Sequence, residues 1–374
     1  MTSALSKELL DRVSEYVGAR MGLHFPEERR SDLERGLSRA APEFGFHDVE
    51  SCARWLMLSP LAKTQIEILA SHLTVGETYF FRDEKMFELL ENRIFPELIE
   101  KRRDEGRHLR IWSAGCATGE EPYSIAIMLK RMLHDFDDWN ITVLATDINP
   151  AFLRKASQGV YGEWSFRGVP SWMKERYFHR TEQGRFEVLA GIRKQVTFSY
   201  HNLAEDHYPS LLNNTNAMDI ILCRNVLMYF AGDRQRQVVE RLYHCLVDGG
   251  RLIVSATEMS AALFSSFVPV SFPSATLYQK DISGAVLPAC PMPREPRPFQ
   301  AAPTPVNAPV VLPPDANAGT PPDKPAKSED EAGFTHVPSD LYREALAAYE
   351  RGCYAESEEK ITTLLSRTGC HAPA

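Results

Sequence analysis

The chain has 374 residues, of which 44% are hydrophobic and 25% charged, and its formal net charge is −8 at pH 7. This composition is typical of a globular protein, and we expect no membrane span because no run of about 18 apolar residues occurs. The acidic balance argues against nucleic acid as the main partner. The seven cysteines form no Cys-x-x-Cys pair and no zinc-like spacing, which favours reduced thiols in the cytoplasm and no bound metal.

The N-terminal quarter of the chain carries apolar residues at the spacing of amphipathic helices. The pattern is clearest in Leu9, Val13, Val17, Leu33 and Leu37. Strand-like alternation is lacking, so we predict an all-α domain over residues 1–90.

Residues 91–283 have a different pattern, in which short apolar runs alternate with helical stretches. The runs are Leu109–Ser113, Ile141–Thr146, Val196–Tyr200, Met218–Cys223, Arg251–Ala256 and Thr276–Gln279. This alternation predicts an α/β domain with a doubly wound, mostly parallel sheet and helices on both faces. Two further runs, Tyr177–Arg180 and Arg185–Leu189, flank a turn at Gly184. They predict a β-hairpin subdomain inserted over residues 160–195.

The C-terminal part changes character twice more. Residues 284–338 hold 14 of the 25 prolines and predict a disordered linker. Residues 339–374 resemble a tetratricopeptide-like helix pair, which would offer a surface to a protein partner. The alternative is an ordinary amphipathic helical tail.

The clearest motif is Ile-Trp-Ser-Ala-Gly-Cys-Ala-Thr-Gly-Glu-Glu-Pro-Tyr-Ser at residues 111–124. An apolar strand runs into a turn of small residues, and a helix begins near Pro122. In wound sheets, ligands bind at such a turn. Glu120 and Glu121 at the helix entrance would repel a phosphate but suit a cationic ligand with hydroxyl groups. S-adenosylmethionine is such a ligand, although the turn could also be a simple tight connection.

Polar residues follow three other predicted strands as well. Asp147 ends one, Asn202 follows another, and Asn225 follows a third. Asp147 suits ligand hydroxyls, although it could instead cap the next helix. Because the carboxyl ends of parallel strands share one edge, these residues predict a single binding site. Upstream, Thr78 and Arg82 flank two phenylalanines that could form either an apolar anchor or a packed corner.

Together these segments resemble the bacterial chemotaxis-receptor methyltransferase (CheR) family over about residues 5–282. T-x-F-F-R-D, W-S-x-x-x-x-T-G-E-E-P-Y-S, T-D-I, N-L and C-R-N-V-x-x-Y-F occur in this order. The resemblance implies methyl transfer from S-adenosylmethionine to receptor glutamates, with S-adenosylhomocysteine as product. It implies cofactor contacts at Thr78, Arg82, Glu120, Asp147, Asn202, Leu203, Asn225 and Val226. The family often has asparagine where Gly76 stands, and Gly76-Glu77 favours a signalling branch that carries tetratricopeptide repeats.

The chemistry requires few catalytic groups. A glutamate side chain, with an ordinary pKa of about 4.3, is already an anionic nucleophile at neutral pH. The enzyme must mainly align carboxylate, methyl and sulfur and exclude water. Arg82 and Tyr229 are our candidates for orienting the carboxylate.

Receptor methylation segments are rich in glutamate, so a basic surface would help them dock. We predict that surface at Arg29, Arg30, Arg35 and Arg39, although interleaved acidic residues also fit a solvated helix with ion pairs.

Three other functions compete with this prediction. The first is a non-catalytic module that senses the cofactor or scaffolds a complex. The second is a methyltransferase for nucleic acid or a small molecule, which the acidic balance disfavours. The third is an NAD-linked dehydrogenase, but the turn lacks G-x-G-x-x-G.

Overall fold

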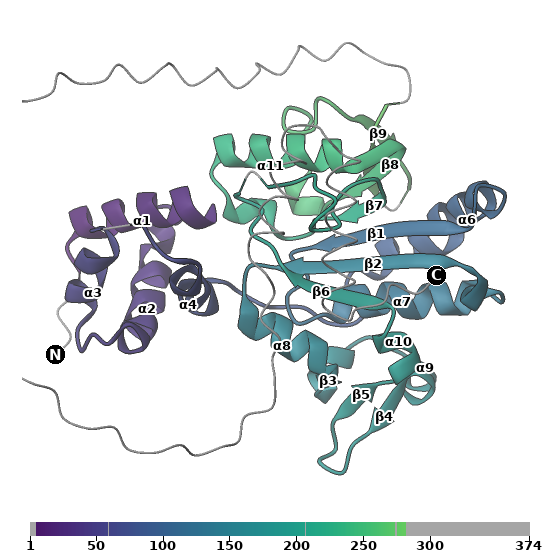
Figure 1. Ribbon diagram of the computed structural model, residues 1–374, viewed down its shortest axis with the longest axis horizontal. Helices are drawn as coiled ribbons and strands as arrows, with labels where there is room; N and C mark the ends of the chain where they lie inside the picture. The colour runs from purple at the N-terminus through teal and green to yellow at the C-terminus, as the bar shows by residue number, and fades with distance from the viewer. Residues whose placement is uncertain (1–4, 59, 206, 274, 282–374) are drawn as a thin grey trace, which may run out of the picture. The chain divides into compact units, whose positions relative to one another are not determined.

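The computed structural model describes residues 5–58, 60–205, 207–273 and 275–281, which belong to one compact unit (Figure 1). The predicted linker at 284–338 and the tetratricopeptide-like pair at 339–374 lie outside the described residues. Within the described ranges, no helix is both long and apolar enough to cross a membrane.

The N-terminal region is helical, as its periodicity predicts. Its α-helices are α1 (Lys7–Met21), α2 (Arg30–Ala40), α3 (Val49–Leu56) and α4 (Lys63–Leu73). The side chain of Ser6 caps α1 by accepting a hydrogen bond from the Leu9 N–H, and Gly22 ends the helix in a left-handed conformation. Val13, Leu33 and other apolar residues at helical spacing face inward and form a separate core.

The second region is built on a seven-stranded sheet with the order β6-β2-β1-β7-β8-β10-β9. The strands are β1 (His108–Ala114), β2 (Asn140–Asp147), β6 (Val196–Tyr200), β7 (Met218–Leu222), β8 (Leu246–Ile253), β9 (Val268–Ser271) and β10 (Thr276–Gln279). The first five are parallel, and β9 and β10 are antiparallel. The predicted fold class is confirmed. The sequence did not reveal β9, whose side chains are mostly exposed and give no apolar run.

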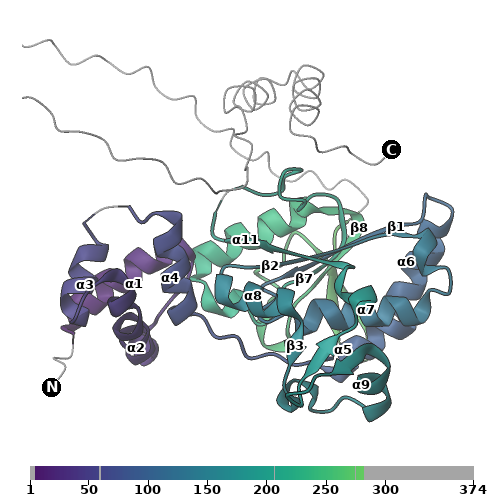
Figure 2. The same cartoon turned by 60° about the horizontal axis from the view of Figure 1, so that its bottom comes forward.

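Helices cover both faces of this sheet (Figures 1 and 2). Successive strand residues point to opposite faces, so Ile220 and Ile221 of β7 belong to different core clusters. One cluster includes residues of α5 (Glu84–Leu89), α6 (Phe95–Arg103), α7 (Glu120–Met132) and α8 (Pro150–Gln158). The other cluster includes α11 (Gly232–Cys245).

The inserted subdomain is a small antiparallel sheet with the order β3-β5-β4. Its strands are β3 (Val160–Tyr161), β4 (Phe178–Arg180) and β5 (Phe186–Val188), with α9 (Ser171–Tyr177) and α10 (Ala190–Arg193) beside them. The hairpin expected at Gly184 is thus present, with one further strand. Stacked Phe80 and Phe166, whose ring centroids lie 4.9 Å apart, join this subdomain to the segment that precedes α5.

Candidate functional site

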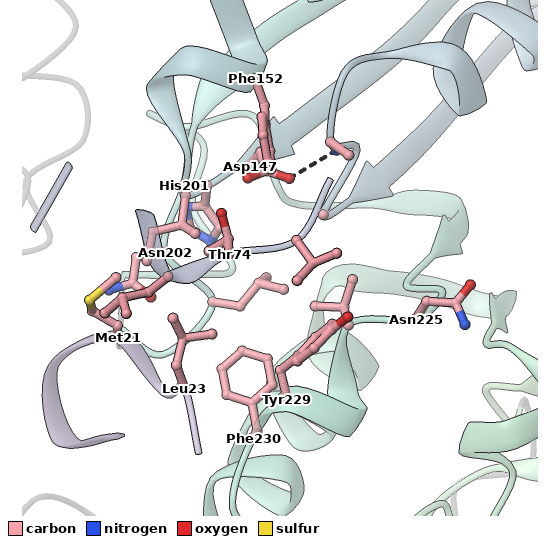
Figure 3. A pocket seen from close by; sticks show the side chains of 17 residues that line it. Met21, Leu23, Thr74, Asp147, Phe152, His201, Asn202, Asn225, Tyr229 and Phe230 are labelled. Atoms are coloured by element: carbon pink, nitrogen blue, oxygen red, sulfur yellow. Dashed lines mark hydrogen bonds between the residues drawn. The ribbon is translucent and has the colours of Figure 1, made fainter. Parts of the chain in front are cut away.

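A cavity lies at the carboxyl ends of β6, β2, β1 and β7, and Figure 3 shows its lining. It is lined by Gly115 and Ala117 after β1, Asp147 on β2, His201–Leu203 after β6, and Asn225, Val226, Tyr229 and Phe230 after β7. Met21, Leu23 and Leu73–Val75 of the N-terminal region complete the wall. Because most of these side chains are apolar, we call it the apolar cavity.

A second, smaller cavity adjoins the first and shares Val75, Gly115, Ala117 and Asn225 with it. Its own lining residues are mostly charged or polar: Glu77, Thr78, Arg82, Cys116, Glu121 and Arg224. We call it the charged cavity. Together the two cavities suit a ligand with an apolar end and a charged end.

The turn after β1 leaves no room for larger side chains. Gly115 has a φ of 84°, and a Cβ there would lie 2.3 Å from Cγ2 of Val226. Glycine is therefore required at this position both by the backbone conformation and by the contact with the loop after β7. This contact brings the ends of β1 and β7 together at the cavity.

Asp147 is a buried carboxylate at the cavity wall. One of its oxygens accepts the Ala117 N–H at 2.9 Å, shown in Figure 3, and the other accepts the Asn149 N–H at 2.9 Å. Burial raises its pKa to about 6, against the opposing effect of these hydrogen bonds. Holding the charge at pH 7 therefore costs about 3 kcal/mol, and further donors from a ligand would offset that cost.

Of the two glutamates at the start of α7, Glu121 rather than Glu120 lines a cavity. Glu120 is 1% exposed, and its carboxylate accepts hydrogen bonds from Thr118 Oγ1 at 2.6 Å and Ser165 Oγ at 3.0 Å. It thereby ties the turn to the inserted subdomain. Glu121 accepts a hydrogen bond from Ser113 Oγ at 2.7 Å and borders the charged cavity.

Arg224 organises the charged cavity, although the sequence had not singled it out. Its guanidinium, 5% exposed, lies 3.1 Å from carboxylates of both Asp83 and Glu121. It also donates to the backbone carbonyl of Arg82 at 3.0 Å. The side chain of Arg82 donates to the Glu77 carbonyl at 2.6 Å. Arg224 thus fixes the segment that carries Arg82 against the start of α7.

The loop after β7 carries Asn225, which lines both cavities and has a φ of 58°. Its backbone is held by Glu258, a buried residue beyond β8. The Glu258 carboxylate accepts the N–H groups of Asn225 and Val226 at 2.7 Å each. No sequence pattern indicates this role, because the partners are backbone groups about thirty residues away.

Tyr229 lies where this loop meets the N-terminal region. Its carbonyl accepts the His24 N–H at 2.6 Å, and the guanidinium of Arg29 lies 5.2 Å from the centre of its ring. On the other side of the cavity, Asn202 donates to the carbonyl of Arg20 at 3.0 Å. Two strand ends are therefore tied to the end of α1 and the segment after it.

The four predicted docking arginines do not form one open basic surface. Arg29 and Arg35 both pair with Asp32, and Arg30 pairs with Asp11 at 2.7 Å. Arg39 is exposed. These ion pairs support the alternative of a solvated, charge-balanced helix, and only Arg29 is in contact with a residue of the cavity.

Gly76 has a neighbour that explains the absence of a larger residue there. A Cβ at this position would lie 2.5 Å from Cζ of Phe152, whose ring lines the apolar cavity. The phenylalanine thus occupies the space that an asparagine would need.

Comparison with known proteins gives a consistent result. A family model described as the CheR methyltransferase, SAM binding domain, matches residues 76–271. A chemotaxis protein methyltransferase of Borreliella burgdorferi is 32% identical over 68% of this chain and 89% of its own. A probable chemotaxis protein methyltransferase of Rhizobium etli is 35% identical, covering 63% of this chain and 87% of its own. The probable biofilm formation methyltransferase WspC of Pseudomonas aeruginosa is 30% identical, covering 72% of this chain and 61% of its own.

Proposed function

The chain belongs to the CheR methyltransferase family, and we propose that it methylates glutamate side chains of a chemoreceptor-type protein with S-adenosylmethionine. The products would be glutamyl methyl esters and S-adenosylhomocysteine. The observation that carries the proposal is the pair of adjoining cavities at one sheet edge, apolar on one side and charged on the other.

The lining residues fit the three parts of this cofactor. Asp147 suits ribose hydroxyls because its carboxylate is buried at the cavity wall, where ligand hydroxyls would add to the backbone donors of Ala117 and Asn149. The apolar cavity beyond it, toward β6, suits the purine, with Leu203 and Phe152 in its wall. The charged cavity suits the amino-acid end, which carries one ammonium and one carboxylate, because it offers both Glu121 and Arg82.

The reaction requires alignment rather than proton transfer. The cofactor supplies a methyl group on a positively charged sulfur, which an ionised glutamate attacks directly. We propose that Arg82 and Tyr229 orient that glutamate, because each lines a cavity at the loop that carries Asn225. Arg29 adds a positive charge over the Tyr229 ring and would attract the incoming carboxylate.

Four further assignments belong to this proposal. The domains are residues 1–90, which contribute to the cavity wall, and residues 91–283, which bind the cofactor. The C-terminal 339–374 segment would bind a protein partner. Arg39 would dock the receptor directly, and Arg30 and Arg35 would do so only after exchanging Asp11 and Asp32. We place the activity in the cytoplasm, where receptor methylation segments are accessible.

The test uses S-adenosylmethionine with a labelled methyl group and membranes that contain methyl-accepting receptors. We expect label on the receptor that is released by base, as a methyl ester requires. Cofactor binding without any base-labile label on the receptor would instead support the sensing or scaffolding alternative. Tyr229→Phe should then lower the rate while leaving S-adenosylhomocysteine binding within about threefold, because its hydroxyl acts on the glutamate. Arg82→Lys should lower both the rate and S-adenosylhomocysteine affinity, because Arg82 also faces the amino-acid end of the cofactor.

A further inference from the structure

We propose that Glu258 is a positioning residue for this reaction, which acts through the backbone of the loop after β7 to fix Asn225 at the two cavities. The inference rests on the proposed function, because it assumes that these cavities bind the cofactor. Glu258 itself lines neither cavity.

The Glu258 carboxylate is saturated with donors. Oε1 accepts the N–H groups of Val226 at 2.7 Å and Met228 at 3.2 Å. Oε2 accepts the N–H of Asn225 at 2.7 Å, together with the N–H and the hydroxyl of Ser255 at 3.1 and 2.6 Å. Glu258 is 7% exposed, so these donors replace the water that an ionised carboxylate needs.

Three of these five bonds reach across to a different strand end. The bond from the Ser255 N–H belongs to a capping box for the short 3₁₀ turn Ala256–Glu258, and the bond from the Ser255 hydroxyl joins the same two residues, so both are local. The other three come from consecutive or nearly consecutive N–H groups of the loop after β7. Such a concave row of N–H groups is an anion-binding nest, and here the chain's own carboxylate fills it.

The loop requires this support because its conformation is uncommon. Asn225 has a φ of 58°, which residues other than glycine seldom adopt, and the following Val226 presses its side chain against the turn at Gly115. Asn225 is also the residue through which the two cavities adjoin on the β7 side. A carboxylate that bonds the N–H groups of both residues therefore sets the direction of the Asn225 side chain.

The experiment is a double-variant cycle with S-adenosylhomocysteine as the probe. Binding is measured by titration calorimetry for the full-length protein, Glu258→Gln, Asn225→Ala and the double variant. In Glu258→Gln an amide NH₂ replaces one acceptor and faces loop N–H groups. We expect about tenfold weaker binding, the effect of losing one hydrogen bond to a charged group. In the Asn225→Ala background the same substitution should change affinity less than about twofold, because its effect passes through Asn225.

Ser255→Ala is the matched control. It removes one bond to the same carboxylate and should lower the melting temperature while leaving affinity within about twofold, because the three loop bonds remain. If Glu258→Gln does not fold, Glu258→Asp, which keeps the charge but shortens the side chain, replaces it in the cycle.

The outcomes separate the two proposals. Failure of the wild-type protein to bind S-adenosylhomocysteine overturns the proposed function. When the wild type binds S-adenosylhomocysteine normally, two results overturn only the role of Glu258. One is unchanged affinity in the Glu258 variant, and the other is a double variant in which the two losses of affinity multiply.

Discussion

Replacing Asp147 by asparagine should separate cofactor binding from stability. The side chain keeps its size but loses its charge, and the buried carboxylate has a pKa of about 6 rather than 3.8. Removing the charge relieves about 3 kcal/mol at pH 7. The amide can accept only one of the two backbone N–H groups well, which costs about 1–3 kcal/mol. The two effects nearly cancel, so we expect little change in melting temperature.

Affinity should change much more than stability. Hydrogen bonds from ligand hydroxyls to a buried carboxylate contribute about 1.5–3 kcal/mol, so the variant should bind S-adenosylhomocysteine about 10- to 150-fold more weakly. Titration calorimetry measures the affinity and scanning calorimetry the melting temperature of the same preparation. Asp147→Ala should also weaken binding more than about tenfold, but with a loss of stability, because both N–H groups lose their acceptor.

Asp219 provides a matched control in the same sheet. It is 1% exposed on β7, and its carboxylate accepts the Arg110 N–H at 2.9 Å and pairs with Arg102 at 2.6 Å. It lines neither cavity. Asp219→Asn should therefore lower stability and leave affinity unchanged. Unchanged affinity in a folded Asp147→Asn protein, or equal losses in both variants, would refute the assignment of Asp147 to the ligand.

The remaining predictions concern pH and packing. Because the pKa of Asp147 is raised from 3.8 to about 6, its ionised form destabilises the fold at neutral pH, and this penalty is lost as pH falls from about 6 toward 3.8. The affinity for S-adenosylhomocysteine should fall over the same range, by at most about tenfold per pH unit. Titrations from pH 7.5 to 5 test this, and Asp147→Asn should abolish the change. Gly76→Asn should lower the free energy of unfolding by about 1–3 kcal/mol because Phe152 must move, and adding Phe152→Val should restore it; no rescue would contradict the contact. Arg224→Met should lower the free energy of unfolding by about 2–3 kcal/mol, less than the loss of a fully buried pair costs, because the Asp83 side chain is 40% exposed. An unchanged melting temperature would count against a stabilising role of the ion pairs that Arg224 makes with Asp83 and Glu121.

The fold could be predicted from the sequence mainly because its central strands are buried. All six predicted apolar runs overlap strands of the sheet, and β1, β2 and β7 are apolar because helices cover both of their faces. Among the strands that the structure describes, β9 in this sheet, with mostly exposed side chains, and the two-residue β3 in the inserted subdomain escaped the pattern. The family and its chemistry were also predicted correctly, because the motifs are local in sequence.

The details of the site were harder to predict for geometric reasons. Glu120 and Glu121 are adjacent in the first turn of a helix, so they point about 100° apart, and sequence does not give the helix phase that decides which one faces the cavity. Arg224 and Glu258 act through backbone groups and distant carboxylates, which no spacing rule detects. The roles of the remaining predicted site residues stay predictions until binding is measured.

The matched family region begins at Gly76, yet the apolar cavity also needs Met21, Leu23 and Leu73–Val75. An expressed fragment that starts at Gly76 would therefore carry every sequence motif but lack the part of the cavity wall that the N-terminal region supplies. Such a fragment should fold its sheet and still fail to retain S-adenosylhomocysteine. A fragment could then contain every motif without binding the ligand, and the shortest fragment that binds would have to include α1.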